Sequence, residues 1–108
     1  IGTGSATGAA KQNLVKVAIY NGTKTEGITK IAEEELKRKI PNLETVAKEN
    51  ASRDDYEKSV VVVIAKNKDK EGKAVADALG AEVSILPEGE TATVGAEILI
   101  ILGADYIK

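Results

Sequence analysis

Two unbroken apolar runs constrain the fold of this chain more than any other feature. Residues 59–65 read SVVVVIA, and residues 97–102 read EILIIL. A strand carries apolar side chains on both faces when the sheet is covered on both sides, which is typical of strands inside a largely parallel sheet. Neither run approaches the ~20 apolar residues that a helix needs to cross a bilayer. We therefore predict two buried strands, with residues 59–65 at the centre of the sheet.

Three shorter stretches have the β-branched residues and partial alternation of half-buried strands. They are residues 14–20, 43–47 and 82–86. The polar stretch between the second of these and the first apolar run, residues 48–58, is predicted to be a loop. Pro87-Glu88-Gly89 has turn composition and separates the last two strands.

A first helix is predicted between the first two strands. Thr23 and Glu26 match the S/T-x-x-E capping box, so we expect the helix to begin near Lys24. Its apolar residues have the i, i+3, i+4 spacing of a stripe that faces a sheet. They are Ile28, Ile31, Ala32, Leu36 and Ile40.

A second helix is predicted over residues 70–79, where apolar residues again recur at helical spacing. Asn67 or Asp69 is expected to cap its beginning, and Gly80 to end it. The two helices follow a faintly repeated pattern, in which a strand and a polar turn lead to Glu-Gly. Gly27 and Gly72 hold equivalent places in this pattern, 45 residues apart. The repeat therefore indicates two βαβ-like halves.

The predicted order is βαββαββ, which indicates an α/β (α+β) layered sandwich with two helices and a mixed four- or five-stranded sheet. We favour two layers with both helices on one face. A ferredoxin-like arrangement with an added strand is one candidate. A three-layer arrangement is an alternative that better explains two-sided burial of residues 60–64.

The 108 residues fit one domain. The chain opens with IGTGSATGAA, whose small residues have too little apolar mass to fold, so residues 1–12 are predicted to be a flexible linker. Residues 13–108 then form the domain. We expect this linker to follow an anchoring segment that the chain itself does not contain.

Composition narrows the possible functions. The chain contains no Cys and no His, which excludes thiol nucleophiles, imidazole bases and the usual zinc ligands. The remaining residue types form no recognisable catalytic motif, and no cofactor or metal site is predicted. The 15 basic and 17 acidic residues give a net charge of -2, which argues against nucleic acid as a partner. The acidic residues 54, 55 and 57 lack the spacing of a calcium loop.

The loop YNGTKTEGIT, residues 20–29, nearly matches the phosphate-binding pattern G-x-x-x-x-G-K-[ST]. Gly22, Gly27 and Thr29 fit, but Ile28 stands where the lysine belongs. A structural role is therefore favoured over nucleotide binding. In that role Asn21-Gly22 supplies a positive-φ turn, and Gly27 allows close packing of the helix on the sheet. Contact with another anion or a glycan through backbone N–H groups is the alternative.

The order of three segments resembles the LytR-type C-terminal domain of cell-envelope proteins. They are VAIYNGTKTEGITKIAEEEL, VVVVIAKNKDKEGKAVADALG and ILIILGADY. The most specific positions are Asn21, Gly22, Thr23 and Gly27 at the opening, and Leu102-Gly103-x-Asp105 at the end. The resemblance runs from about residue 14 to residue 106.

The resemblance implies a non-catalytic, extracytoplasmic accessory module of a bacterial envelope protein, tethered to the membrane through a segment absent from this chain. Its partner would be peptidoglycan, a wall glycopolymer or an envelope protein, without membrane insertion by this fragment. Some relatives follow a glycopolymer transferase domain, but this chain has no room for one, and that activity is not carried over. The expected ligand-binding residues are Asn21, Gly22, Thr23, Lys24 and Gly27. An alternative is an interaction or oligomerisation domain that acts through a sheet edge, at the short strand of residues 43–47.

Overall fold

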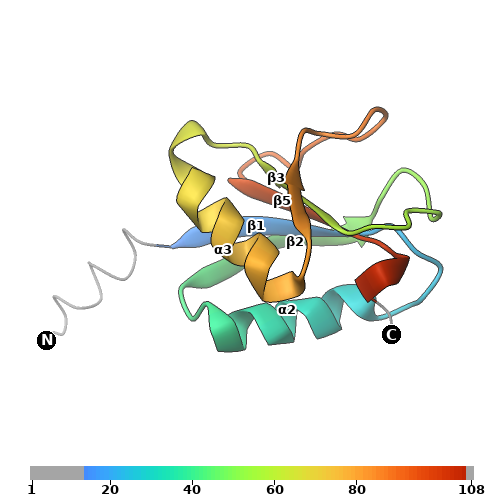
Figure 1. Cartoon of the computed structure of the whole chain (residues 1–108), viewed down its shortest axis with the longest axis horizontal. Coiled ribbons are helices and arrows are strands. Elements are labelled where there is room, and N and C mark those ends of the chain that lie inside the picture. Colours follow the sequence, from blue (N-terminus) through green and yellow to red (C-terminus); the bar gives the residue numbers. More distant parts are fainter. Residues whose placement is uncertain (1–13, 107–108) are drawn as a thin grey trace, which may run out of the picture.

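The computed structural model describes residues 14–106 and shows a five-stranded sheet with two helices (Figure 1). The predicted linker, residues 1–12, lies outside the described residues. The elements in chain order are β1 (Val15–Asn21), α2 (Ile28–Lys39), β2 (Leu43–Asn50), β3 (Val60–Val63), η1 (Lys66–Lys68), α3 (Asp69–Leu79), β4 (Glu82–Ser84), β5 (Ile98–Leu102) and η2 (Ala104–Tyr106). The predicted βαββαββ order and the mixed α/β class are confirmed.

The strand order in the sheet is β2-β1-β5-β3-β4. β1 is parallel to both β2 and β5, whereas β3 is antiparallel to β5 and parallel to β4. Two βαβ units, β1-α2-β2 and β3-α3-β4, therefore flank the central strand β5. The two βαβ-like halves predicted from the sequence repeat are therefore confirmed. The ferredoxin-like candidate is wrong, because there a third strand separates the parallel strands of each unit, whereas here those strands are neighbours.

Both helices cover the same face of the sheet (Figure 1). Each parallel pair is joined by a helix, and such connections are almost always right-handed. The strands of the first unit are antiparallel to those of the second, and the two units add their second strands at opposite edges of the sheet. Because strand direction and edge are reversed together, two right-handed connections place both helices on the same face of the sheet. One apolar cluster unites Leu36 of α2, Val75 of α3, and Val17 and Ile100 of the sheet. The expected two-layer arrangement is therefore present.

The opposite face is covered by loops rather than by a third layer. Tyr20, Leu99 and Ile101 point to this side and pack with Tyr56 from the loop after β2. The hydroxyl of Tyr20 donates a hydrogen bond to the carbonyl oxygen of Thr91, 2.6 Å away, in the loop between β4 and β5. This explains how an apolar strand is buried on both faces in a two-layer fold.

The centre of the sheet is β5 and not residues 59–65. All five residues of β5 are buried. β3 lies between β5 and the edge strand β4, so Val60 and Val63 remain partly accessible and Ile64 is 39% exposed. Both runs are apolar because they are interior strands. Their composition does not reveal which of them is central.

The apolar stripe of α2 is narrower than predicted. Ile28, Ala32 and Leu36, spaced i, i+4, i+8, are buried against the sheet, whereas Ile31 lies on the flank and is 57% exposed. In α3 neither expected cap residue makes a side-chain capping hydrogen bond, but Gly80 ends the helix with φ 72° as predicted. Within residues 14–106 no helix is long and apolar enough to cross a membrane.

The place of Gly72 in the fold shows how closely the layers approach. A Cβ on Gly72 would overlap Cγ2 of Val63 on β3. Glycine costs about 1 kcal/mol relative to alanine inside a helix, so close packing on β3 is the physical reason for glycine here. In the sequence repeat Gly72 was matched with Gly27, but Gly27 precedes its helix and Gly72 lies within the first turn of α3.

Candidate functional site

The carboxyl ends of β1, β2 and β5 meet at one end of the sheet, at the right of Figure 1. Three loops converge there: residues 22–27 after β1, residues 51–59 between β2 and β3, and residues 103–106 after β5. In open α/β sheets ligands bind outside the carboxyl ends of parallel strands. The five residues proposed from sequence all belong to the end of β1 or to the first of these loops.

Asn21 holds the first loop in shape. It is only 8% exposed, and its Oδ1 accepts hydrogen bonds from the backbone N–H and the hydroxyl of Thr23, at 2.8 and 2.7 Å. Its Nδ2 donates to the carbonyl oxygen of Thr25 at 2.8 Å. Both ends of the side-chain amide are thus engaged inside the protein. Asn21 shapes the site and is not free to hold a ligand by itself.

The predicted capping box does not form. The hydroxyl oxygen of Thr23 accepts from the N–H of Thr25 at 3.1 Å, two residues on, and α2 begins only at Ile28. Gly27 stands at the start of the helix with φ 82° and without a side-chain cap. Asn21 and Thr23 together stabilise a turn that competes with the first helical turn.

The two glycines of the loop exchange the roles expected of them. Gly22 does not have positive φ; a Cβ there would lie 2.6 Å from the carbonyl oxygen of Leu102 and 2.7 Å from Cδ1 of Tyr56. Gly27 has positive φ, and a Cβ there would meet nothing within 4 Å. Gly22 therefore permits close packing, and Gly27 permits the backbone turn.

The second loop threads between the other two. The N–H of Gly22 donates a hydrogen bond to the carbonyl oxygen of Leu102 at 2.9 Å. The carbonyl oxygen of Gly22 accepts one from the N–H of Tyr56 at 3.0 Å. On the other side, the carbonyl oxygen of Tyr56 accepts from the N–H of Ala104 at 2.9 Å. We call these contacts among Gly22, Tyr56 and Ala104 the end junction. It joins all three loops through backbone groups.

The closing motif Leu102-Gly103-x-Asp105 completes this junction. One carboxylate oxygen of Asp105 accepts from the N–H and the hydroxyl of Ser59, at 2.9 and 2.8 Å, and the Ser59 hydroxyl oxygen accepts from the N–H of Gly103. A Cβ on Gly103 would come 2.5 Å from the backbone of Lys58. The opening and closing motifs, distant in sequence, therefore lock the same loop from two sides.

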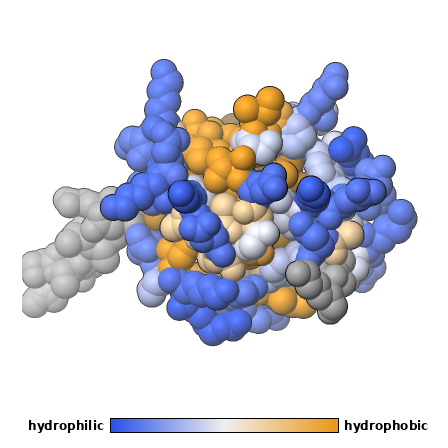
Figure 2. Space-filling model, in the orientation of Figure 1, coloured by the Kyte–Doolittle hydropathy of each residue, from blue (hydrophilic) through white to orange (hydrophobic). Residues whose placement is uncertain are grey.

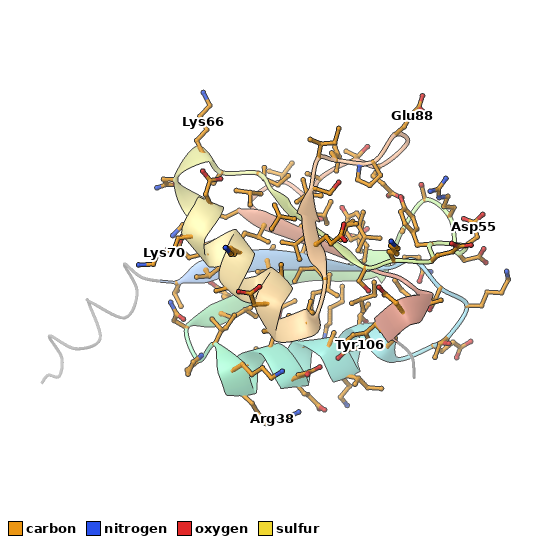
Figure 3. All side chains as sticks on the ribbon, viewed as in Figure 1. Arg38, Asp55, Lys66, Lys70, Glu88 and Tyr106 are labelled. Atoms are coloured by element: carbon orange, nitrogen blue, oxygen red, sulfur yellow. The ribbon has the colours of Figure 1, made fainter. Side chains whose placement is uncertain are left out.

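The last turn is fastened to α2. The hydroxyl of Tyr106 donates to a carboxylate oxygen of Glu35 at 2.6 Å. This hydrogen bond, helped by Lys39, lowers the pKa of Glu35. Burial and the same carboxylate raise the pKa of Tyr106. Tyr106 lies over α2 in Figure 3.

Glu90 braces the second loop from behind. Its carboxylate accepts from the N–H and hydroxyl of Ser52, at 3.1 and 2.7 Å, and from the hydroxyl of Tyr56 at 2.6 Å. Burial alone would raise the pKa of Glu90, but the hydrogen bonds from Tyr56 and Ser52 outweigh burial and lower it. Burial and the nearby carboxylate raise the pKa of Tyr56 to about 12. Sequence reasoning missed Glu90, since its partners lie more than 30 residues away in the chain.

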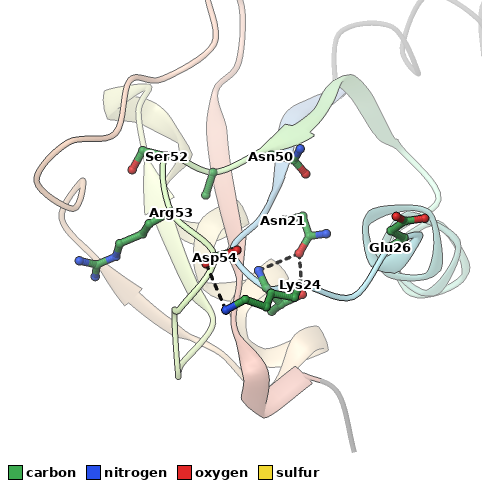
Figure 4. A pocket seen from close by; sticks show the side chains of 9 residues that line it. Asn21, Lys24, Glu26, Asn50, Ser52, Arg53 and Asp54 are labelled. Carbon is green, nitrogen blue, oxygen red and sulfur yellow. Dashed lines mark hydrogen bonds and ion pairs between the residues drawn. The ribbon is translucent and has the colours of Figure 1, made fainter.

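An open polar cleft of about 420 Å³ lies between the first two loops (Figure 4). Its lining residues are Asn21, Thr23, Lys24, Glu26, Asn50, Ala51, Ser52, Arg53 and Asp54. Lys24 and Asp54 point toward each other across it, with Nζ and Oδ1 3.6 Å apart, and their side chains are 80% and 58% exposed. Arg53 points outward and stacks on Tyr56, 4.4 Å from the ring centroid.

The five predicted residues divide into three groups. Thr23 and Lys24 line the cleft, with Asn21 behind them. Gly22 is buried in the end junction. Gly27 lines a neighbouring hollow of about 250 Å³ beside the ends of β1 and β2. Ser52, Arg53 and Asp54 complete the cleft, although their stretch was predicted only as loop.

Residues 14–106 contain no group of three His, Cys, Asp or Glu side chains that could hold a metal ion. Asp54 and Asp55, whose spacing does not match a calcium loop, are paired with Lys24 and Arg53. Two of the three tyrosine rings, Tyr20 and Tyr56, are buried. The cleft therefore offers hydroxyl, amide and charged groups and no free aromatic face.

Because Gly22 and Gly27 have different roles, replacing each by asparagine should affect the free energy of unfolding differently. Gly27→Ala should cost about 1–2 kcal/mol because of its left-handed backbone, and Gly27→Asn should recover most of that loss. Gly22→Ala should cost about 1–3 kcal/mol through overpacking, and Gly22→Asn should cost more because it is larger. Urea denaturation of the four variants measures this. Equal losses for the two asparagine variants would contradict the assignment.

Glu90 predicts a specific pH dependence. Its folded-state pKa lies below the ordinary value of 4.5, so the carboxylate stabilises the fold above that pH and loses its contribution as pH falls through the lowered value. Glu90→Gln should lower the free energy of unfolding by about 1–3 kcal/mol at neutral pH, with a shrinking difference in acid. The exposed neighbour Glu88 provides the control Glu88→Gln (Figure 3). A constant difference down to the acid range would refute the role of the carboxylate.

The family model described as LytR cell envelope-related transcriptional attenuator, LytR_C, matches residues 14–106. Among curated proteins and among solved structures, none matches this chain. The matched range contains both motifs of the end junction and every residue of the cleft. The expected resemblance is confirmed over nearly the whole chain, and the chain belongs to the LytR C-terminal family of cell-envelope-related domains.

Proposed function

We propose that this domain is a non-catalytic, extracytoplasmic accessory module that binds a cell-wall component in the cleft between residues 22–27 and 50–54. Membership of an envelope-related family supports the setting. The main support for this site is that Asn21 and Glu90 hold the two loops in place by hydrogen bonds, while the polar side chains that line the cleft remain exposed. Groups held in place before binding lose little entropy when a ligand arrives.

The chemistry of the cleft favours a ligand with hydroxyl groups and charges of both signs. Lys24 and Arg53 are balanced by Glu26 and Asp54, so the lining has no excess of either sign. Sugar recognition often relies on aromatic faces, but Arg53 covers the ring of Tyr56. A peptidoglycan fragment, with sugar hydroxyls and a charged stem peptide, fits better than a polyanionic wall polymer.

The ion pair between Lys24 and Asp54 is suited to exchange with a ligand. Both side chains are largely exposed, and such pairs contribute about 0–1 kcal/mol. A ligand that brings a carboxylate to Lys24 or an amine to Asp54 therefore replaces a weak contact at little cost. The braced residues behind them do not need to move.

The roles of the carboxylates support a binding function over catalysis. Both carboxylate oxygens of Glu90 accept hydrogen bonds from Ser52 or Tyr56, and Oδ1 of Asp105 accepts two from Ser59, so these carboxylates serve to hold loops in place. Asp54 is an exposed ion-pair partner. The hydroxyl of Thr23 donates to an amide oxygen, which is not a base. The hydroxyl of Ser52 donates to the carboxylate of Glu90, but the lowered pKa of Glu90 makes that carboxylate a weak base for activating a nucleophile.

Titration with a soluble disaccharide-peptide fragment of peptidoglycan, followed by amide NMR, tests the proposal. We expect shifts at residues 21–28 and 50–54. Lys24→Ala should weaken binding by up to about tenfold, the equivalent of ~1.4 kcal/mol. Lys66→Ala removes an exposed lysine from the other end of the molecule, as Figure 3 shows, and should leave binding unchanged.

Two outcomes would overturn the assignment. Unmoved amides in both loops at millimolar fragment would exclude the cleft as the site for this ligand. Stronger shifts with a teichoic-acid polymer than with the peptidoglycan fragment would show that anions are preferred, contrary to the balanced charges of the lining.

The alternative, an interaction domain that uses the edge at residues 43–47, receives less support. β2 is indeed an edge strand. However, its register with β1 shifts at Val46, which is an extra residue, and the exposed residues Glu44, Lys48 and Glu49 add charges along the strand. Bulges and charges are the usual protection of an edge against pairing.

A further inference from the structure

The opposite edge of the sheet, β4, carries less of this protection, because it has no bulge and its one charged residue is Glu82. β4 pairs only with β3, in a regular three-residue register without a bulge. The chain continues after it with two more apolar residues before Pro87. Val83, Ile85 and Leu86 are 50%, 85% and 36% exposed. Figure 2 shows an apolar patch on the face where Figure 1 places β4, bordered by hydrophilic side chains.

The helix beside this edge carries an ordered row of charges. A groove of about 620 Å³ between α3 and β4 is lined by Asp69, Lys73 and Asp77, as well as by Val83. The three charged residues are spaced i, i+4, i+8, so they lie along one side of the helix with alternating sign. Within residues 14–106 neither Lys73 nor Asp77 makes an ion pair, which leaves both charges open to a partner.

We propose that β4 is a self-association edge, at which a second copy of this chain pairs antiparallel about a twofold axis through Ser84. This pairing joins two sheets into one of ten strands. It sets Val83 of each copy opposite Ile85 of the other, because residues equally far from the axis face each other. Four exposed apolar side chains then cluster around the axis.

The same twofold axis also brings opposite charges of the two α3 helices together. Only Gly80 and Ala81 separate the end of α3 from β4, so Leu79 is roughly level with Glu82. Two strand residues advance about 6.6 Å, which a helix covers in about four residues. Val75, midway between Lys73 and Asp77, is therefore level with Ser84. Lys73 of each copy then faces Asp77 of the other.

The spacing between the two helices is also suitable. α3 packs over both β3 and β4. With neighbouring strands about 4.8 Å apart, the two α3 helices would run side by side at about 10 Å, the usual distance for packed helices. Charge pairing across the axis is self-complementary, which identifies a second copy of this chain as the occupant rather than an unrelated strand.

Sedimentation equilibrium of charge-reversed variants tests this arrangement. Lys73→Asp sets Asp against Asp at both contacts, and Asp77→Lys sets Lys against Lys. Each variant alone should dimerise at least about tenfold more weakly than the wild type. Mixed together they should recover association, because every contact then joins opposite charges. Lys70→Asp changes the net charge equally on the same helix and should behave like the wild type.

The proposal fails if the wild-type chain remains monomeric up to about 1 mM. It also fails if the mixed variants associate no better than either one alone. Circular dichroism of each variant confirms that the fold is retained, and these surface residues make no ion pairs that folding requires. The inference is independent of the proposed ligand cleft at the opposite side of the sheet, so Lys24→Ala should dimerise normally.

Discussion

The backbone hydrogen bonds that hold Tyr56 between Gly22 and Ala104 are the constraint on which the rest of the structure depends. The loop of residues 51–59 crosses the end of the sheet, where buried backbone groups need partners. It finds them only because Gly22 and Gly103 carry no side chain and allow the loop to approach. Tyr56 then fills the face of the sheet that the helices leave open, and residues 50–54 are held as one wall of the cleft.

The acidic residues at this end serve two different purposes. Glu90 accepts hydrogen bonds from Ser52 and Tyr56, and one oxygen of Asp105 accepts two from Ser59, so both carboxylates fix loops in place. Asp54, in contrast, makes one exposed ion pair with Lys24. A hydrogen-bonded carboxylate with donors on several sides is costly to remove, while an exposed pair contributes little. This difference separates residues that build the site from residues that are free to meet a ligand.

Much of the fold could be predicted from sequence, because burial dictates the long apolar runs and the stripes of the helices. The start of α2 could not, since Asn21 captures Thr23 in a turn that local pattern does not distinguish from a capping box. The roles of Gly22 and Gly27 depend on which segments approach them in space. Glu90 had no local signal, because its partners Ser52 and Tyr56 are 38 and 34 residues away. Strand order likewise follows from long-range pairing.

Native-state hydrogen exchange at the end junction tests the central claim most directly. The account predicts that the amides of Tyr56 and Ala104 exchange almost as slowly as those of β1 and β5, because their hydrogen bonds open only when the sheet does. The amide of Asp55, in the exposed part of the same loop, should exchange rapidly. If Tyr56 and Ala104 exchanged as fast as Asp55, the junction would not be the element that organises this end of the protein.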